Sequence, residues 1–357
     1  MKAARRRSAA DFAGRLLAWY DAHRRVLPWR RPVPDAWQTW VSEVMLQQTR
    51  VDVVAAVFDG FIDRYPDPAS FARAGDDELL AAWQGLGYYR RARLLREGAR
   101  QVVARHDGRV PADPAALAEL AGVGRYTQGA IASIAFGAVQ AAIDGNVERV
   151  FARHAALTDE VKQAATQRHL RARVLARIDR RRPGDFNPAL MDLGATVCTP
   201  RNPACEHCPV AADCEARRLG LTRELPRLPP RRATIAIRAA AVLITDATGR
   251  SRASRIPDGE VNSGQLELPG PGVLVDVGDD RRALLAALRT RHGLRCQLGE
   301  PLLTIRHTIT QHRIVLTLHR ATLRGTPPPG LRFVDAQSVW STPSRKALAG
   351  AQALPPR

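Results

Sequence analysis

Four of the five cysteines in this chain are gathered in one short stretch. Cys198, Cys205, Cys208 and Cys214 follow the spacing C-x6-C-x2-C-x5-C. Thiolates spaced in this way hold a metal centre in a reducing compartment, where disulfides are rare. Zinc and an iron–sulfur cluster both accept four cysteine ligands, and the spacing alone does not separate them. His207 is a spare candidate ligand, but four cysteines already close such a site.

Two carboxylates, Glu43 and Asp144, are the other candidates for chemistry. Glu43 falls off the apolar stripe of a helix predicted over 37–50, so it either lines a cleft or is solvated, as most helical glutamates are. Asp144 follows the apolar run 141–143 and either acts in a site or caps the next helix. Two carboxyl groups in different surroundings can be held in opposite protonation states and can therefore divide acid and charge-stabilising roles.

A tight glycine turn joins two runs of helical spacing within residues 117–136. Gly122 and Gly124 flank a single apolar residue, which predicts a helix-hairpin-helix. The start of the second helix would direct backbone N–H groups outward, and such a start is a ready phosphate site. An ordinary corner between two helices is the alternative. A second glycine turn, 85–87, precedes Tyr88, which could wedge between bases or pack in the core.

The chain of 357 residues carries a formal net charge of +19, and both sides of residue 224 are basic. Such a charge favours a polyanionic partner, nucleic acid above all, with a generally basic proteome as the plainer explanation. Nearly all the basic residues are arginines, since only Lys2, Lys162 and Lys346 are lysines. No apolar run approaches the about 18 residues of a membrane span, and no secretory signal is visible. We therefore expect a cytoplasmic protein that binds no membrane.

Helical spacing without persuasive strand alternation predicts an all-α first half. A Pro/Arg-rich stretch then predicts a linker, after which expected strands at 234–245, 301–309 and 312–321 and a helix at 281–292 indicate a small α+β domain. The predicted organisation is a basic N-terminal tail (1–10), an all-α domain (11–224), a linker (225–233), an α+β domain (234–342) and a frayed tail (343–357).

Taken together, these features resemble the helix-hairpin-helix DNA glycosylases, specifically the MutY family of adenine DNA glycosylases. The motifs stand in family order between residues 27 and 214: LPWR at 27–30, SEVMLQQT at 42–49, GLGYY at 85–89, GVGRYT at 122–127, DGNV at 144–147 and the cysteine stretch at 198–214. The resemblance implies an all-α glycosylase domain with a 4Fe–4S cluster on the four cysteines, followed by a Nudix-like α+β domain.

The implied function is that of a monofunctional glycosylase in base excision repair, acting as a monomer. It would hydrolyse the N-glycosidic bond of adenine mispaired with 8-oxoguanine or guanine in double-stranded DNA. Glu43 would protonate the adenine ring, and Asp144 would stabilise or trap the charged sugar, as carboxylates do in glycosidases. Tyr126 and Asn146 match positions that hold the sugar and support the acids. Relatives that also cut the strand carry a lysine where this chain has Tyr126, so strong lyase activity is not expected.

The resemblance also assigns contacts to DNA, whose target base must be flipped out to reach the acid. Arg30 or Arg31 would line the base pocket, and Gln48 and Tyr88 would fill or wedge the gap. The hairpin residues expected at a phosphate are Gly122, Val123, Gly124 and Arg125, with the amides of Val123 and Arg125 as donors.

The C-terminal domain departs from the family pattern. The segment 263–270, SGQLELPG, resembles the LWEFPG-type segment of the Nudix-like domain without its tryptophan and phenylalanine, and the glutamate-rich Nudix helix is absent. The family's Phe-Ser-His loop, which recognises oxidised guanine, reads Ile309-Thr310-Gln311 here. Thr310, Gln311 and the following His312 are the candidate substitutes, and the strength of the preference for 8-oxoguanine stays open.

Two other functions stay open. A mismatch-specific thymine DNA glycosylase would share the hairpin, the cluster, the tyrosine and the aspartate, but thymine has no ring nitrogen that gains much from an acid such as Glu43. A catalytically silent DNA-binding module is the second alternative, and it would not need both Glu43 and Asp144.

Overall fold

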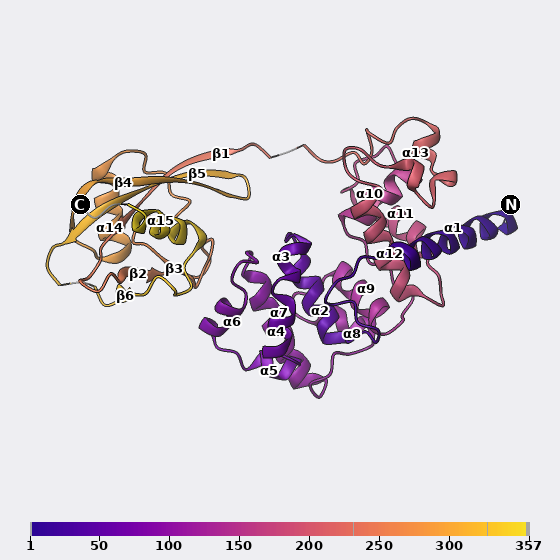
Figure 1. The fold of residues 1–357 in the computed structure, drawn as a ribbon, viewed down its shortest axis with the longest axis horizontal. Coiled ribbons are helices and arrows are strands. Elements are labelled where there is room, and N and C mark those ends of the chain that lie inside the picture. The colour runs from indigo at the N-terminus through magenta and orange to yellow at the C-terminus, as the bar shows by residue number, and fades with distance from the viewer. Residues whose placement is uncertain (1, 231, 327, 355–357) are drawn as a thin grey trace. The chain divides into compact units, whose positions relative to one another are not determined.

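The computed structural model describes residues 2–230, 232–326 and 328–354, which form two compact units (Figure 1). The first unit contains the residues up to Ala74 and Gly85–Pro230, and the second contains Gly75–Gln84 and the residues after Pro230. No helix of the described residues is long and apolar enough to cross a membrane.

The first unit is helical, as predicted, apart from an isolated β-bridge between Glu160 and Arg227. Its elements are α1 (Lys2–His23), α2 (Ala36–Leu46), α3 (Val51–Ala55), α4 (Phe58–Arg64), α5 (Pro68–Ala72), α7 (Arg90–Arg105), α8 (Pro114–Glu119), α9 (Arg125–Ile134), α10 (Gly145–His154), α11 (Ala164–Leu175), α12 (Pro183–Thr196), the 3-10 turns η1 (Cys205–His207) and η2 (Ala211–Asp213), and α13 (Glu215–Arg218).

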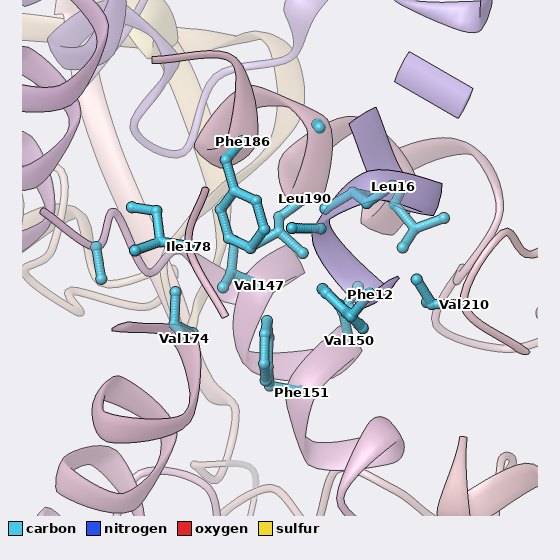
Figure 2. Close-up of a cluster of buried hydrophobic side chains, with 14 of the residues drawn as sticks. Phe12, Leu16, Val147, Val150, Phe151, Val174, Ile178, Phe186, Leu190 and Val210 are labelled. Atoms are coloured by element: carbon cyan, nitrogen blue, oxygen red, sulfur yellow. The ribbon is translucent and has the colours of Figure 1, made fainter. Parts of the chain in front are cut away.

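One hydrophobic cluster joins the N-terminal helix to the helices that follow the hairpin. Val147, Val150 and Phe151 lie one helical turn apart on α10 and are buried against Phe12 of α1 and Phe186 of α12 (Figure 2). The side chains of α11 close the same cluster from another direction. Because Asp144 caps the N-terminus of α10, this packing fixes the position of that carboxylate in the fold.

Helix α2 confirms the predicted apolar stripe but is shorter than predicted. The side chain of Asp35 accepts a hydrogen bond from the backbone N–H of Gln38 at 2.7 Å and starts the helix. The stripe residues Trp37, Trp40, Val41, Val44 and Met45 are all buried. The helix ends at Leu46 instead of residue 50, because Gln48 takes a left-handed conformation with φ of 58°.

The glycine turn between α8 and α9 is present, but its two glycines differ. Gly122 has φ of 79°, and a Cβ there would lie 2.9 Å from the Cβ of Leu94, so glycine is required. Gly124 has an ordinary φ of −85°, and a Cβ there would meet nothing within 4 Å. The backbone of the turn therefore requires glycine at position 122 but not at 124, where the missing side chain leaves open space beside the first residues of α9.

The second unit is α+β, as predicted, and holds two three-stranded sheets in the orders β1-β5-β4 and β3-β2-β6. Strand β1 pairs parallel with β5, and β4 and β5 form the predicted antiparallel hairpin around Thr310 and Gln311 (Figure 1). The elements are α6 (Asp76–Ala82), β1 (Ile235–Leu243), β2 (Ser251–Arg255), β3 (Leu266–Glu267), α14 (Arg281–His292), β4 (Cys296–Ile309), β5 (His312–Leu323), β6 (Arg332–Val334) and α15 (Thr342–Gln352).

The prediction of a frayed tail from residue 343 is wrong for most of its length. Helix α15 starts with proline in its first turn, and its Ala347 and Leu348 are buried in the core of the second unit. This burial holds the segment in place; residues 355–357 lie outside the described part of the chain. At the other end, α1 begins at Lys2, so residues 2–10 of the predicted basic tail belong to a helix.

The contact between α9 and the chain before Asp144 yields a test of this packing. A Cβ at Gly129 would lie 2.3 Å from the carbonyl oxygen of Ala141, which is backbone and cannot move aside cheaply. We expect Gly129→Ala to lower the free energy of unfolding by about 1–3 kcal/mol or more. Gly60, in α4, has open space around its Cα, so Gly60→Ala should raise it by roughly 0.5–1 kcal/mol. Urea unfolding checks both, and equal effects of the two variants would contradict the contact.

Candidate active site and iron–sulfur site

A cavity of about 1200 Å³ in the first unit gathers most of the predicted site residues. It lies between the C-terminal part of α2, the hairpin, the start of α10 and α12, with the loop before α2 on one side. The predicted residues among its lining are Arg30, Arg31, Glu43, Gln48, Gly122, Gly124, Arg125, Tyr126, Asp144 and Asn146. Tyr88 and Val123 do not line it, and Thr310, Gln311 and His312 belong to the second unit.

Glu43 is buried on the wall of this cavity, with 5% of its surface exposed, and is not the solvated glutamate of the alternative interpretation. Burial raises its pKa to about 7, and the negative charge of Asp144 adds to the rise, while a hydrogen bond from Tyr126 and the charge of Arg30 oppose it. Near neutral pH a large fraction of Glu43 therefore carries a proton. This is the state that a general acid requires.

The Tyr126 hydroxyl donates a hydrogen bond to Oε2 of Glu43. Burial raises the pKa of Tyr126 well above 10, and the nearby carboxylates Glu43 and Asp144 raise it further. The phenol therefore remains a neutral donor and fixes the orientation of the acid. Tyr126 lies in the first turn of α9, so the hairpin positions this contact.

Asp144 is both the cap of α10 and part of the cavity wall, so the two interpretations of this residue are compatible. One carboxylate oxygen accepts the backbone N–H of Val147 at 2.8 Å, and the other accepts Nδ2 of Asn146 at 2.8 Å. Two donors and a helix N-terminus all favour negative charge at this position. The cavity thus holds one desolvated acid and one hydrogen-bonded carboxylate.

A chain of hydrogen bonds leads from Asp144 to the cysteine stretch. The side-chain oxygen of Asn146 accepts Nη2 of Arg149 at 2.8 Å, and Nε of Arg149 donates to the carbonyl oxygen of Cys198 at 2.7 Å. Nη2 of Arg149 also donates to the carbonyl of Gly194 in α12 at 2.8 Å. A Cβ at Gly194 would lie 2.5 Å from the Cβ of Asn146. Sequence reasoning missed Arg149 and Gly194; the spacing of Asn146 and Arg149 by three residues was the available signal.

Arg30 lies in the cavity wall, but its guanidinium is hydrogen-bonded to a buried acid, Asp192. Nη1 and Nη2 of Arg30 donate to the two carboxylate oxygens of Asp192 at 2.7 and 2.9 Å, and Arg25 donates to the same carboxylate at 2.7 Å. Burial of Asp192 works against its charge, but the bonds from Arg30 and Arg25 keep its pKa below the usual value. Arg30 therefore holds the loop before α2 in place, and Asp192 was missed. Arg31 is half-exposed and pairs with Asp59 at 2.7 Å.

Arg91 hydrogen-bonds to the turn that follows α2 and to the glycine turn 85–87. These two turns carry Gln48 and Tyr88, which are predicted to fill the gap that a flipped base leaves in the DNA. Its Nη1 donates to the carbonyls of Val44 and Met45 at 2.7 and 2.8 Å, and its Nη2 donates to that of Leu86 at 2.9 Å. Gln48 and Tyr88 have positive φ angles of 58° and 45° and are exposed. Non-glycine residues rarely adopt such angles, and the surrounding structure must impose them. Sequence reasoning did not single out Arg91.

The hairpin offers fewer free amides than predicted. The N–H of Val123 donates to the carbonyl of Leu120 at 3.1 Å within the turn, so this amide is not free here, and its contact with a phosphate stays a prediction. The first N–H groups of α9, from Arg125 onward, have no partner inside their own helix. Together with the open space at Gly124, these groups remain available to an anion.

The four cysteines line a second, smaller cavity, at the end of α10. Burial raises the pKa of Cys208 to about 12 and also raises the pKa of Cys205 and Cys214, so their thiolates need a cationic centre. In the described part of the chain, no three His, Cys, Asp or Glu residues are gathered to hold a single metal ion. Cysteines spread around a cavity fit a multi-atom cluster. The spare candidate ligand His207 does not take part, because it is exposed and does not line this cavity.

Arg153 supplies positive charge beside these thiolates. It is 2% exposed, and its Nη1 lies 3.4 Å from Sγ of Cys198 as a hydrogen-bond donor. The same guanidinium donates to the carbonyls of Thr199, Pro200 and Leu225 at 2.7 to 2.9 Å. The cysteine stretch is therefore tied to α10 at both Arg149 and Arg153.

Comparison with known proteins places this geometry in a family. Residues 41–174 match the model of the HhH-GPD superfamily of base excision DNA repair proteins, and residues 198–214 match the iron–sulfur binding domain of endonuclease III. An adenine DNA glycosylase of Mycolicibacterium smegmatis is 44% identical over 206 residues, which cover 57% of this chain and 69% of the relative. The chain belongs to the adenine DNA glycosylase family. Its four clustered cysteines hold a 4Fe–4S cluster, as predicted.

Other relatives have a higher sequence identity to this chain, but the chain covers a smaller part of their length. The human adenine DNA glycosylase is 47% identical over 214 residues, which cover 58% of this chain and 39% of the human protein. The chain thus spans well under half the length of the mammalian relatives it matches. Among solved structures, a thermostable thymine-DNA glycosylase aligns with a TM-score of 0.54 and 28% identity, over 60% of this chain and 98% of that one.

The burial of Glu43 generates a prediction for stability. Its pKa is raised in the folded protein, from 4.5 to about 7, so the wild type loses stability as the pH rises through this window, whereas a neutral glutamine does not. We expect Glu43→Gln to raise the free energy of unfolding by up to about 3 kcal/mol at pH 8, at 1.36 kcal/mol per pKa unit. The gain should nearly vanish close to pH 4.5. Urea titrations of both proteins across this range measure it.

The exposed Glu119 on α8 provides the matched control. Glu119→Gln should change stability little, and by the same amount at every pH. A pH-independent difference between wild type and Glu43→Gln would show that Glu43 is not held in its protonated form.

Proposed function

We propose that the protein is a monofunctional DNA glycosylase of base excision repair that removes adenine mispaired with 8-oxoguanine or guanine in double-stranded DNA. The observation that carries the proposal is the pairing in one cavity of a desolvated Glu43 with a hydrogen-bonded Asp144. The adenine DNA glycosylases among its relatives support the choice of base. The surplus of positive charge supports a DNA partner.

The proposed reaction begins with protonation of the adenine ring. Glu43 donates its proton to a ring nitrogen of the flipped base, which makes adenine a neutral leaving group. Tyr126 holds the acid in place, because its hydroxyl donates to the carboxyl oxygen that does not need to face the base. Cleavage of the bond leaves positive charge on the sugar, and the ionised Asp144 stabilises or traps this charge until water completes the hydrolysis.

Contacts to DNA follow from the groups that the structure leaves available. The N–H groups at the start of α9 would bind a phosphate beside the open space at Gly124. Gln48 and Tyr88, exposed on the two turns that Arg91 holds, would occupy the gap that the flipped base leaves. The Nudix-like character of the second unit and its contact with the base opposite adenine, through Thr310, Gln311 or His312, are part of the same proposal.

One of the three lysines of the chain also lines the cavity. Lys162 lines it, but its Nζ is bound to both carboxylate oxygens of Glu148, at 2.7 and 2.9 Å. A lysine amine whose protons are bound to a carboxylate in this way is not presented as a nucleophile. The position next to Glu43 is held by Tyr126 instead, which supports a glycosylase without strong lyase activity.

The thymine glycosylase alternative is less well supported. The matching thymine-DNA glycosylase structure is 28% identical, whereas several adenine DNA glycosylases are 41–47% identical. A buried acid with a pKa near 7 also suits the removal of adenine, because the adenine ring has nitrogens that can accept its proton. Activity on a T:G duplex with none on A:G would reverse this choice.

Single-turnover release of adenine tests the proposed acid. We expect Glu43→Gln to slow the release by at least about 100-fold, the lower end of what a general acid contributes. In the wild type, the rate should fall as the pH rises through about 7, because Glu43 loses its proton there. Glu119→Gln should behave like the wild type, and borohydride should trap little covalent adduct. Full activity in Glu43→Gln, or a rate that increases above pH 7, would contradict the proposal.

The base opposite adenine tests the role of the second unit. Gln311 lies in the hairpin turn, while the hydroxyl of Thr310 donates to the carbonyl of Ile309 at 2.8 Å. We therefore expect Gln311→Ala to weaken binding to A:8-oxoguanine duplexes several-fold, with little change on A:G. Gln297, whose side chain accepts a hydrogen bond from Arg324 on the same hairpin, supplies the control Gln297→Ala. Equal affinities of the wild type for both duplexes would mean that no residue of this turn senses the oxidised base.

A further inference from the structure

We propose that His154 donates a hydrogen bond from Nε2 to the iron–sulfur cluster and thereby raises its reduction potential. His154 is the last residue of α10 and directly follows Arg153. It would be a tuning residue for the cluster and not a ligand, since four cysteines already supply the thiolates.

The first observation is an unpaired buried nitrogen. Only 7% of His154 is exposed, and its Nε2 is buried without a hydrogen-bond partner among the described residues. Leaving a buried polar atom unpaired costs about 1–3 kcal/mol, so such atoms are rare unless a partner is bound. The unpaired nitrogen therefore indicates that His154 binds an acceptor that does not belong to the polypeptide.

The second observation is the place of this residue. His154 lines the same cavity as Cys198, Cys205, Cys208 and Cys214. Sulfur atoms of a cluster bound there would be hydrogen-bond acceptors inside the cavity that His154 lines. Arg153 already serves the Sγ of Cys198, so the two consecutive residues would contact different parts of the cluster.

The surroundings keep the imidazole neutral and its ring fixed. Burial lowers the pKa of His154 to about 4, and the charges of Arg177, Arg173 and Arg15 act in the same direction, against Asp213. The ring packs edge-on against Phe12, with centroids 4.9 Å apart, and against Phe151 at 6.2 Å. Both phenylalanines belong to the rigid cluster shown in Figure 2. A neutral, immobile imidazole has one N–H to donate.

Donation to the cluster has a definite electrochemical consequence. A hydrogen bond to a sulfur withdraws electron density and stabilises the more reduced state of the cluster, so its potential rises. The competing account is an N–H that rests on the ring of Phe12 and leaves the cluster untouched. That account predicts no change in potential when the nitrogen is removed.

The experiment compares cluster potentials in the full-length protein with its cluster. EPR-monitored redox titrations of wild type, His154→Leu and His154→Gln are measured together with iron and sulfide content. We expect a more negative midpoint potential in His154→Leu and a partial return in His154→Gln, whose amide can still donate. His207, exposed within the cysteine stretch and outside the cavity, gives the matched control His207→Leu, which should leave the potential unchanged.

A second measurement does not depend on the variants folding. In wild-type protein labelled with 15N-histidine, pulsed EPR of the paramagnetic cluster should show a weak coupling to one imidazole nitrogen. Absence of this coupling would overturn the proposal, as would equal potentials in wild type and His154→Leu at equal iron content. A shift of the same size in His207→Leu would also overturn it, because it would show a general effect of removing histidines.

Discussion

The active site depends on the desolvation of one carboxyl group. Glu43 is buried on the wall of the cavity, where the charged form is costly, and the nearby Asp144 increases that cost. Asp144 keeps two hydrogen-bond donors and a helix N-terminus, which favour a carboxylate at this position. A single cavity can therefore keep an acid and a charged carboxylate at the same pH, which hydrolysis of an N-glycosidic bond requires.

The rest of the first unit serves to hold these two groups. Tyr126 fixes Glu43 from the hairpin, while Asn146 and Arg149 tie Asp144 to α12 and to the backbone of the cysteine stretch. A distortion of the cysteine stretch would be transmitted to Asp144 through only two side chains, those of Arg149 and Asn146. The iron–sulfur site is therefore linked to Asp144 through hydrogen bonds of Asn146 and Arg149.

Much of the fold and of the site could be predicted from the sequence because the signals are local. Helical spacing predicted the stripe of α2, alternation predicted the β4–β5 hairpin, and cysteine spacing predicted a metal centre, which the family resemblance identified as a 4Fe–4S cluster. The end of α2 was missed because Arg91, far along the chain, binds the carbonyls of Val44 and Met45 in the last turn of the helix, just before the left-handed Gln48. Helix α15 was missed because its order comes from burial against the second unit's core, which its own weak pattern does not reveal.

The missed site residues share the same cause. Asp192 and Arg149 act through partners that are distant in sequence or lie on another helix, so no motif marks them. The opposite error occurred at Val123, where a motif suggested a free amide that the turn itself uses. Sequence patterns indicate which residue types are present, whereas hydrogen-bond competition within the fold decides which groups remain free.

The most direct test of this account is the protonation state of Glu43 itself. The protein is labelled with 13C at glutamate side-chain carboxyls, and Glu43→Gln identifies the resonance that belongs to this residue. The account predicts a chemical-shift titration midpoint near pH 7, because burial disfavours the carboxylate. A midpoint near 4.5, the ordinary value for glutamate, would show that Glu43 is ionised at neutral pH and would contradict its role as the acid.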